Sequence, residues 1–261
     1  MASVTLHLFL FMVAIVIVAG CTSVGQVTQP PEPETISVAS WNLQIFGTKK
    51  AGNETLMNIY AGIIDDYDVV IVQEIRDSSE TAFPLLCSRL DGYQCNISSR
   101  AGRTSSKEQY GVIYKNGITI SGWEDFNPDV GDRWERPPLR VDFTANGSTF
   151  TLYTIHIKPE AVGEELAYLE DVVNTSGTVL VIGDLNADCN YYNSVQESDF
   201  DSWHWIIGNN EDTTSGASNC AYDRIILNDA AFHAYRQDGI WSDGITPVVS
   251  DHYLVWSTFV V

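Results

Sequence analysis

Short polar motifs stand directly after apolar runs at six places in this chain, and this pattern constrains the fold more than any other feature. Two of the runs, Asp68–Val72 and Thr178–Ile182, are rich in β-branched residues, as buried strands are. Strand ends are rigid positions that can hold catalytic groups. The six motifs are Ser40-Trp41-Asn42, Gln73-Glu74, Ile155-His156, Gly183-Asp184-Leu185-Asn186, Tyr222-Asp223-Arg224 and Ser250-Asp251-His252. We therefore expect an α/β or α+β domain whose strand ends build one site.

The N-terminal residues have the features of a targeting segment. Ser3 to Gly20 is almost wholly apolar, and Val18-Ala19-Gly20-Cys21 resembles the lipobox of prokaryotic lipoproteins, which predicts lipidation of Cys21. A plain secretory signal and an uncleaved membrane anchor are the alternatives. All three predict an exported domain. We assign residues 1–21 to the signal, the proline-rich residues 22–35 to a tether, and residues 36–261 to one globular domain.

Cysteine usage fits an exported protein. If Cys21 is lipidated, an even set of four cysteines remains, as is usual for disulfide-bonded proteins in an oxidising compartment. Proximity in sequence suggests that Cys87 pairs with Cys95. Buried free thiols are the alternative.

The charge balance limits how the protein can bind a polyanion. The chain has 34 acidic and 14 basic residues and a net charge of −20. Such a surface keeps an extracellular protein soluble or suits it to high salt. The balance argues against a general electrostatic attraction to a nucleic acid, so contact with one must depend on a few local arginines, bound cations or screening by salt.

The acids and amides of the motifs are candidate ligands for a hard divalent cation. Glu74 directly follows a buried strand, where an isolated carboxylate would ordinarily cap a helix or form a surface ion pair. Together with Asn42, Asp184, Asn186 and Asp251 it forms a set of oxygen donors of the kind that Mg²⁺ or Mn²⁺ prefers. The alternative for the segment 183–188 is an ordinary turn, since Gly, Asp and Asn all favour turns.

Two histidines lie in motifs and suit proton transfer. His156 ends the apolar run 150–155, and His252 follows Asp251. With Glu108 and Asp223 available to orient their rings, the pair could act as general base and general acid. His204 and His233 lie outside the motifs, and we expect no catalytic role for them.

A polar loop in the C-terminal half is a candidate structural Ca²⁺ site. Asp212, Thr214, Gly216 and Ser218 alternate before Cys220, so their oxygens can face one side of the loop. A plain polar loop without a cation is the alternative.

These residues resemble the endonuclease/exonuclease/phosphatase superfamily and, within it, the pancreatic-type deoxyribonucleases. The resemblance runs from about Ile36 to the C-terminus. The superfamily shares the core motifs, whereas the flanks Asp188-Cys189 and Asn219-Cys220-Ala221-Tyr222 are specific to the deoxyribonuclease branch. Its strongest segments are 41–47, 72–78, 183–189 and 212–225.

The resemblance implies a four-layered α/β sandwich, two packed and mainly antiparallel sheets flanked by helices, and a metal-dependent phosphodiesterase site. It implies that Glu74 is the main metal ligand, with Asn42 and Asp251 nearby. It implies further that Asp184 and Asn186 bind metal or the scissile phosphate, and that His156 paired with Glu108 and His252 paired with Asp223 are the acid and base.

The resemblance also implies roles outside the chemical step. Arg76, Arg103 and Arg136 would contact DNA, the loop 212–218 would hold Ca²⁺, and Cys189 would pair with Cys220.

Several departures from the family pattern concern DNA contact rather than chemistry. Gln44 stands where the family has an arginine, Ser106 stands where it has an aromatic residue before Lys107-Glu108, and the small disulfide loop before Arg136 is missing. The Cys87–Cys95 pair is additional. These changes affect affinity and sequence preference for DNA.

The function expected from the sequence is an exported, monomeric endonuclease that nicks double-stranded DNA and touches a membrane only through its N-terminal anchor or lipid. A sphingomyelinase or phosphoinositide phosphatase of the same superfamily is the alternative enzyme, against which the deoxyribonuclease-specific flanks count. A non-catalytic surface lipoprotein is the third possibility, disfavoured because the acids and both histidines of the motifs are intact.

Overall fold

Two six-stranded sheets form the centre of the protein. The computed structural model describes residues 34–193 and 198–261. The first sheet has the strand order β11-β12-β1-β2-β4-β3, and the second has the order β5-β6-β7-β8-β10-β9. The strands are β1 (Thr35–Phe46), β2 (Val69–Ile75), β3 (Tyr93–Ile97), β4 (Gln109–Lys115), β5 (Thr119–Asp125), β6 (Leu139–Ala145), β7 (Ser148–Thr154), β8 (Thr178–Asp184), β9 (His204–Trp205), β10 (Asp223–Leu227), β11 (Tyr235–Trp241) and β12 (Leu254–Val260). Only the pairs β1/β2 and β7/β8 are parallel among these strands.

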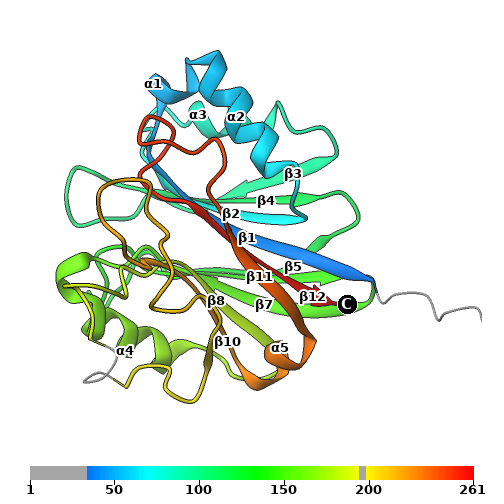
Figure 1. Cartoon of the computed structure of the whole chain (residues 1–261), viewed down its shortest axis with the longest axis vertical. Coiled ribbons are helices and arrows are strands. Elements are labelled where there is room, and N and C mark those ends of the chain that lie inside the picture. The colour runs from blue at the N-terminus through cyan, green and yellow to red at the C-terminus, as the bar shows by residue number, and fades with distance from the viewer. Residues whose placement is uncertain (1–33, 194–197) are drawn as a thin grey trace, which may run out of the picture. The chain divides into compact units, whose positions relative to one another are not determined.

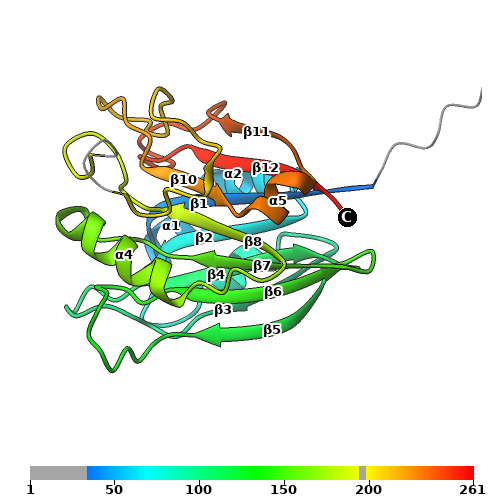
Figure 2. The same ribbon diagram turned by 90° about the horizontal axis from the view of Figure 1, so that it is seen from below.

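Helices cover the outer face of each sheet, which makes four layers (Figures 1 and 2). The first sheet carries α1 (Thr48–Ala51), α2 (Glu54–Ile64) and α3 (Ala82–Cys87), and the second carries the 3₁₀ turn Pro159–Ala161 and α4 (Val162–Val172). The short helix α5 (Asp229–Ala234) instead packs against β8, β10 and β12, with Ala231 in the core between the sheets. The predicted four-layered sandwich is confirmed. The predicted signal 1–21, Cys21 and tether residues 22–33 lie outside the described residues, and Thr35 already belongs to β1.

Alternation of side chains along the strands explains the layers. In β2, Val69 and Ile71 face the core between the two sheets, whereas Val70 and Val72 face the helices on the outer side. A strand covered on both faces is apolar at every position, which is why the apolar run 69–72 is continuous in the sequence. Within the described residues, no helix is long and apolar enough to cross a membrane.

The described residues form two disulfides, and both match the predicted pairing. Cys87 bonds to Cys95 across 8 positions, and Cys189 bonds to Cys220 across 31 positions. Disulfides of this kind fit an oxidising compartment. The second bond ties the loop after β8 to the start of the segment that leads into β10, so it holds two of the polar motifs together.

Loss of the longer disulfide should destabilise the protein more than loss of the shorter one. Changing Cys189 and Cys220 to serine should lower the free energy of unfolding by about 3–4 kcal/mol, against about 2–3 kcal/mol for Cys87 and Cys95, because closing the longer loop restricts the unfolded chain more. Denaturant titration of both double variants gives the comparison. Free thiols at 189 and 220 in peptide digests of exported protein would contradict the assignment.

Candidate active site

The ends of the parallel strands β1 and β2 place the first two motifs side by side. Asn42 lies opposite Gln73 in the register, and the pairing is then interrupted by a bulge before Phe46. Asn42 Nδ2 donates to Glu74 Oε1 at 3.2 Å and to Asp184 Oδ2 at 2.9 Å. Glu74 has a φ of +58°, a strained conformation for a residue with a side chain, and such strain concentrates at functional sites.

A buried hydrogen-bond bridge brings the two sheets together below this edge. Gln73 Nε2 donates to Ser40 Oγ in its own sheet and to Thr154 Oγ1 in the other, both at 3.1 Å. Gly183 has a φ of +153°, and a Cβ there would lie 2.3 Å from the carbonyl oxygen of Ile155. Glycine is therefore required where β8 passes the end of β7, and this close approach places Asp184 among the motifs of the other sheet.

Each motif histidine forms a hydrogen-bonded pair with the predicted carboxylate. His156 Nδ1 lies 2.8 Å from Glu108 Oε2, and His252 Nδ1 lies 2.8 Å from Asp223 Oδ2. The opposite ring nitrogens converge, because His156 Nε2 is 3.3 Å and His252 Nε2 is 3.5 Å from the same oxygen, Asp184 Oδ2. Both imidazoles thus point at one small region next to Glu74.

The electrostatics of the two pairs differ. Burial opposes ionisation of Glu108, but the hydrogen bond from His156 and the nearby Arg136 and Arg76 outweigh it and lower the pKa of Glu108 to about 2. Burial also opposes the charge on His252, yet Asp223 and Asp184 raise the pKa of His252 to about 10. Burial raises the pKa of Asp223. Both shifts keep a proton on the His252–Asp223 pair at neutral pH.

Asp184 is fully buried between the two pairs. Burial raises its pKa, but the two histidines and the Asn42 amide stabilise the carboxylate more strongly, so the net shift is downward. Asn186 follows with a φ of +49° and donates Nδ2 to the carbonyl oxygen of Ile157 at 3.0 Å. The segment 184–186 is therefore fixed by its own side chains, as the motif's turn-forming composition allows.

The Ser250-Asp251-His252 segment is tied to the end of β1. Ser250 Oγ donates to the carbonyl oxygen of Asn42 at 2.6 Å, and His252 N donates to Ser250 Oγ at 3.1 Å. Lys50 Nζ donates to the carbonyl oxygens of Leu43 and Val249, both at 2.8 Å. Burial lowers the pKa of Lys50 to about 8, against the opposing effect of Asp251 and Glu74.

The donors at this edge fit a divalent cation. Asp251 Oδ1 is buried without a hydrogen bond among the described residues, an oxygen that a bound cation would satisfy. Two sets of ligand atoms within 4.8 Å of one another occur here, Glu74–Glu108–His156 and Asp184–Asp223–His252. The Asn42 oxygen accepts from Gln44 N at 2.8 Å while its nitrogen faces the carboxylates, so in this arrangement Asn42 orients the acids. Its role as a ligand stays a prediction.

The three arginines predicted to contact DNA all have acidic partners. Arg76 lies 3.1 Å from Glu74 and 2.6 Å from Glu108, and Arg136 lies 3.4 Å from Glu108. Arg136 also donates to the carbonyl oxygens of His156 and Ile157, so it holds the strand end that carries the histidine. Arg103 instead pairs with Asp132 at 2.7 Å on an exposed loop. Arg76 and Arg136 are therefore part of the cluster, whereas Arg103 is engaged outside it.

The predicted Ca²⁺ loop is held by its own hydrogen bonds. Asp212 Oδ1 accepts from the amide of Thr214, and Thr214 Oγ1 lies 2.8 Å from both Asp212 Oδ1 and the carbonyl oxygen of Ser218, to either of which it can donate. Gly216 at the tip is exposed. Ser215 N donates to the carbonyl oxygen of Asp251 at 2.8 Å, so the loop supports the segment that carries Asp251 and His252. Cation binding by the loop stays a prediction.

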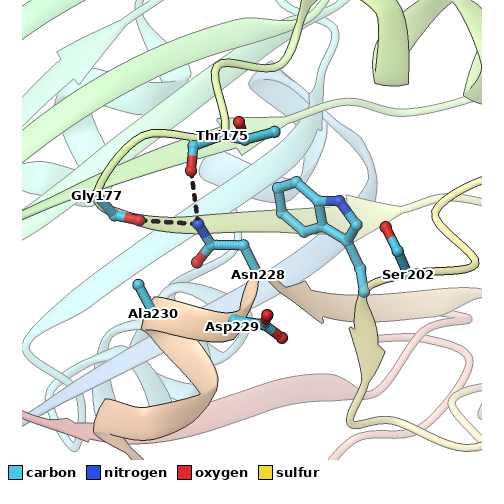
Figure 3. A pocket seen from close by; sticks show the side chains of 7 residues that line it. Thr175, Gly177, Ser202, Asn228, Asp229 and Ala230 are labelled. Carbon is cyan, nitrogen blue, oxygen red and sulfur yellow. Dashed lines mark hydrogen bonds between the residues drawn. The ribbon is translucent and has the colours of Figure 1, made fainter.

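The two histidines expected to be bystanders lie outside the cluster. His204 forms an ion pair with Asp229 at 2.9 Å and stacks on Phe232, and His233 contacts the carbonyl oxygen of Asp229. Near them a pocket is lined by Trp203, Asn228 and Asp229, where Asn228 Nδ2 donates to the carbonyl oxygens of Thr175 and Gly177 (Figure 3). None of the predicted site residues lines this pocket.

Some residues of the cluster were not found from the sequence. The Tyr110 hydroxyl accepts from His156 N at 3.1 Å, and Thr213 Oγ1 accepts from Asp223 N at 3.1 Å. Thr154 Oγ1 accepts the hydrogen bond from Gln73 Nε2 of the other sheet, and Lys50 donates to the carbonyl oxygens of Leu43 and Val249. Tyr110 and Thr154 lie inside strands, where polar side chains alone give no signal. Thr213 lies between Asp212 and Thr214 of the predicted Ca²⁺ loop, and this position next to a motif is the only sequence signal for it.

Comparison of the sequence with known proteins identifies the family of the chain. The model of the endonuclease/exonuclease/phosphatase family matches residues 39–252. Human deoxyribonuclease-1 is 32% identical over 258 residues, covering 85% of this chain and 91% of that protein. Mouse deoxyribonuclease gamma is 31% identical over 218 residues, covering 74% and 70%.

Solved structures share the fold at lower identity. Zebrafish (D. rerio) TDP2 complexed with a single-strand DNA product has a TM-score of 0.64 and 18% identity, covering 86% of this chain and 98% of that chain. A mannosyl-6-phosphatase of Bacteroides thetaiotaomicron has a TM-score of 0.63 and 15% identity, covering 85% and 98%. The structural likeness supports the architecture, and the sequence matches support the relationship. The chain belongs to the endonuclease/exonuclease/phosphatase family.

Proposed function

We propose that the protein is an exported, divalent-metal-dependent endonuclease that nicks double-stranded DNA. The observation that carries this proposal is the convergence of two carboxylate-paired histidines on Asp184 beside the strained Glu74. Membership of the family supports a phosphodiester hydrolase, and the deoxyribonuclease-1 and deoxyribonuclease gamma relatives support DNA as the substrate.

The cluster contains the groups that phosphodiester hydrolysis needs. Glu74 and Asp251 would hold Mg²⁺ or Mn²⁺, with Asn42 orienting the acids. A bound divalent cation neutralises charge on the phosphate and polarises it for attack. His252, which keeps its proton at neutral pH, donates to the leaving oxygen, and His156 accepts the proton of the attacking water. Glu108 and Asp223 fix the rings through their Nδ1 atoms.

A plasmid assay tests the proposal. Purified protein should convert supercoiled plasmid to the open circle with Mg²⁺ and Ca²⁺ present, and EDTA should stop the reaction. The assay is run at low and high salt, because the net charge of −20 repels DNA most strongly when salt is low. Absence of nicking at every salt concentration, with hydrolysis of sphingomyelin or a phosphoinositide instead, would replace the proposal by the lipid-directed alternative.

The assignment of His252 as the proton donor predicts a pH effect for Asp223→Asn. The pKa of His252 is raised, so its protonated form is lost only as the pH rises through about 10. Without the Asp223 carboxylate, His252 should lose its proton at lower pH. The alkaline limb of the kcat–pH profile should therefore shift to lower pH. Plasmid nicking measured across the pH range shows the shift. Asp229→Asn, which alters the His204 pair, is the control, and an unchanged alkaline limb in Asp223→Asn would contradict the role.

A further inference from the structure

A pocket of about 460 Å³ adjoins the catalytic cluster and is lined by side chains that the proposed reaction does not use. We call it the α1 pocket. Its rim begins at the metal-binding edge, because Ile45 N donates to Glu74 Oε2 at 2.8 Å. Lys49 and Lys50 of α1, Leu56 of α2 and Val248 also line it. The α1 pocket therefore borders the edge at which the proposed reaction takes place.

Two exposed aliphatic side chains flank the α1 pocket. Ile45 is 59% exposed and Val248 is 72% exposed. Ile45 also has a φ of +52°, which is costly for a β-branched residue. Single exposed hydrophobic residues need no explanation. Two of them on the rim of one pocket, one held in a strained conformation next to a catalytic carboxylate, indicate a surface that contacts a ligand.

The α1 pocket also offers a free positive charge. Lys49 is exposed, and its ammonium forms no hydrogen bond or ion pair with any residue of the ranges 34–193 and 198–261. The neighbouring Lys50 is engaged by two carbonyl oxygens, and Arg76, Arg103 and Arg136 all face carboxylates. In a chain with a net charge of −20, an unpaired cation beside the catalytic cluster is available to a substrate anion.

We propose that the α1 pocket binds the nucleotide next to the scissile phosphate of a DNA strand. Lys49 contacts the phosphate of that nucleotide, and Ile45 and Val248 contact the apolar surface of its sugar. A strand of duplex DNA has a phosphate at every nucleotide, next to the apolar surface of the sugar, so it matches a cation set among aliphatic side chains. This inference rests on the proposed function and adds the residues that position the substrate.

Salt dependence of binding separates the two kinds of contact. Kd for a fluorescent DNA duplex is measured from low to high salt in EDTA, which removes the divalent cation and stops hydrolysis. Lys49→Gln should weaken binding about fivefold at low salt and reduce the slope of log Kd against log salt by about 0.9, because one phosphate contact is lost. Lys49→Arg should restore both. Val248→Ser should weaken binding without changing the slope, because it removes no charge.

Hydrolysis of a long and a short substrate gives the second readout. Lys49→Gln should lower kcat/KM for plasmid DNA, mainly through KM, far more than for bis(4-nitrophenyl) phosphate, which has no second phosphate for Lys49 to contact. Lys115→Gln is the matched control, since Lys115 pairs with Asp68 at the start of β2, at the other end of the strand that leads to Glu74. Its kinetics with both substrates should equal those of the unmodified protein.

The outcomes distinguish failure of this inference from failure of the proposed function. An unchanged salt slope in Lys49→Gln, or an equal loss on both substrates, would overturn the α1 pocket as a nucleotide site while leaving the nuclease proposal intact. Binding of anionic phospholipid vesicles in preference to DNA, lost in Lys49→Gln, would assign the pocket to a membrane surface and also overturn it. If the unmodified protein hydrolysed neither substrate, the proposed function would fail and this inference with it.

Discussion

Replacing Glu74 by glutamine should lower the rate of DNA nicking at limiting Mg²⁺ by at least about a hundredfold, because the carboxylate charge that holds the cation is lost while size and shape are kept. The fold should survive, since the glutamine carbonyl can still accept from Ile45 N, which donates to Glu74 at 2.8 Å in this structure. Plasmid nicking is measured across a Mg²⁺ titration, with circular dichroism to confirm folding.

Glu80→Gln is the matched control for this prediction. Glu80 lies six positions later, is exposed, and also has a positive φ, of +57°. Its loss removes the same charge from the same segment but from outside the cluster. Nicking by the Glu80 variant should equal that of the unmodified protein. Near-normal nicking by the Glu74 variant at limiting Mg²⁺ would remove Glu74 from the site and, with it, the main candidate ligand.

Alanine at His156 or at His252 should each lower kcat by about 10²–10⁴-fold, because each change removes one half of a proton-transfer pair. The double variant should be little worse than the poorer single variant, since residues that act as a unit give non-additive losses. Gln at 108 or Asn at 223 should cost less than loss of the imidazole, because these carboxylates only orient the rings and hold their protons. Single-turnover nicking rates give the comparison.

His204→Ala serves as the control for the histidine variants. His204 also pairs with an aspartate, Asp229, at 2.9 Å, but it lies outside the cluster, so its loss should leave kcat unchanged. A folded variant of His156 or His252 that kept most of its activity would exclude that residue as acid or base. The proton transfer would then be assigned to a water bound to the metal.

Much of the site could be predicted because its residues follow buried strands. Glu74 and Asp184 each come two positions after the end of a continuous apolar run, and such runs mark strands covered on both faces. The sequence thus determined the strands, the identity of the acids and histidines, and, through resemblance to the family, both the His156–Glu108 and His252–Asp223 pairs. The four-layered architecture followed from the same resemblance, since local periodicity alone cannot pair strands that lie far apart.

Only the tertiary structure decided which polar groups engage one another. The convergence of both Nε2 atoms on Asp184 requires the two sheets to meet at Gln73 and Gly183, a close packing that no local pattern encodes. The same packing pairs Arg76 and Arg136 with Glu108, so these two arginines are engaged by a carboxylate and are not free cations as their sequence alone suggests. Lys49 carries the same charge in the sequence as Lys50. The structure separates their roles: Lys50 is partly buried and donates to two carbonyl oxygens, whereas Lys49 is exposed and its charge is available to a substrate.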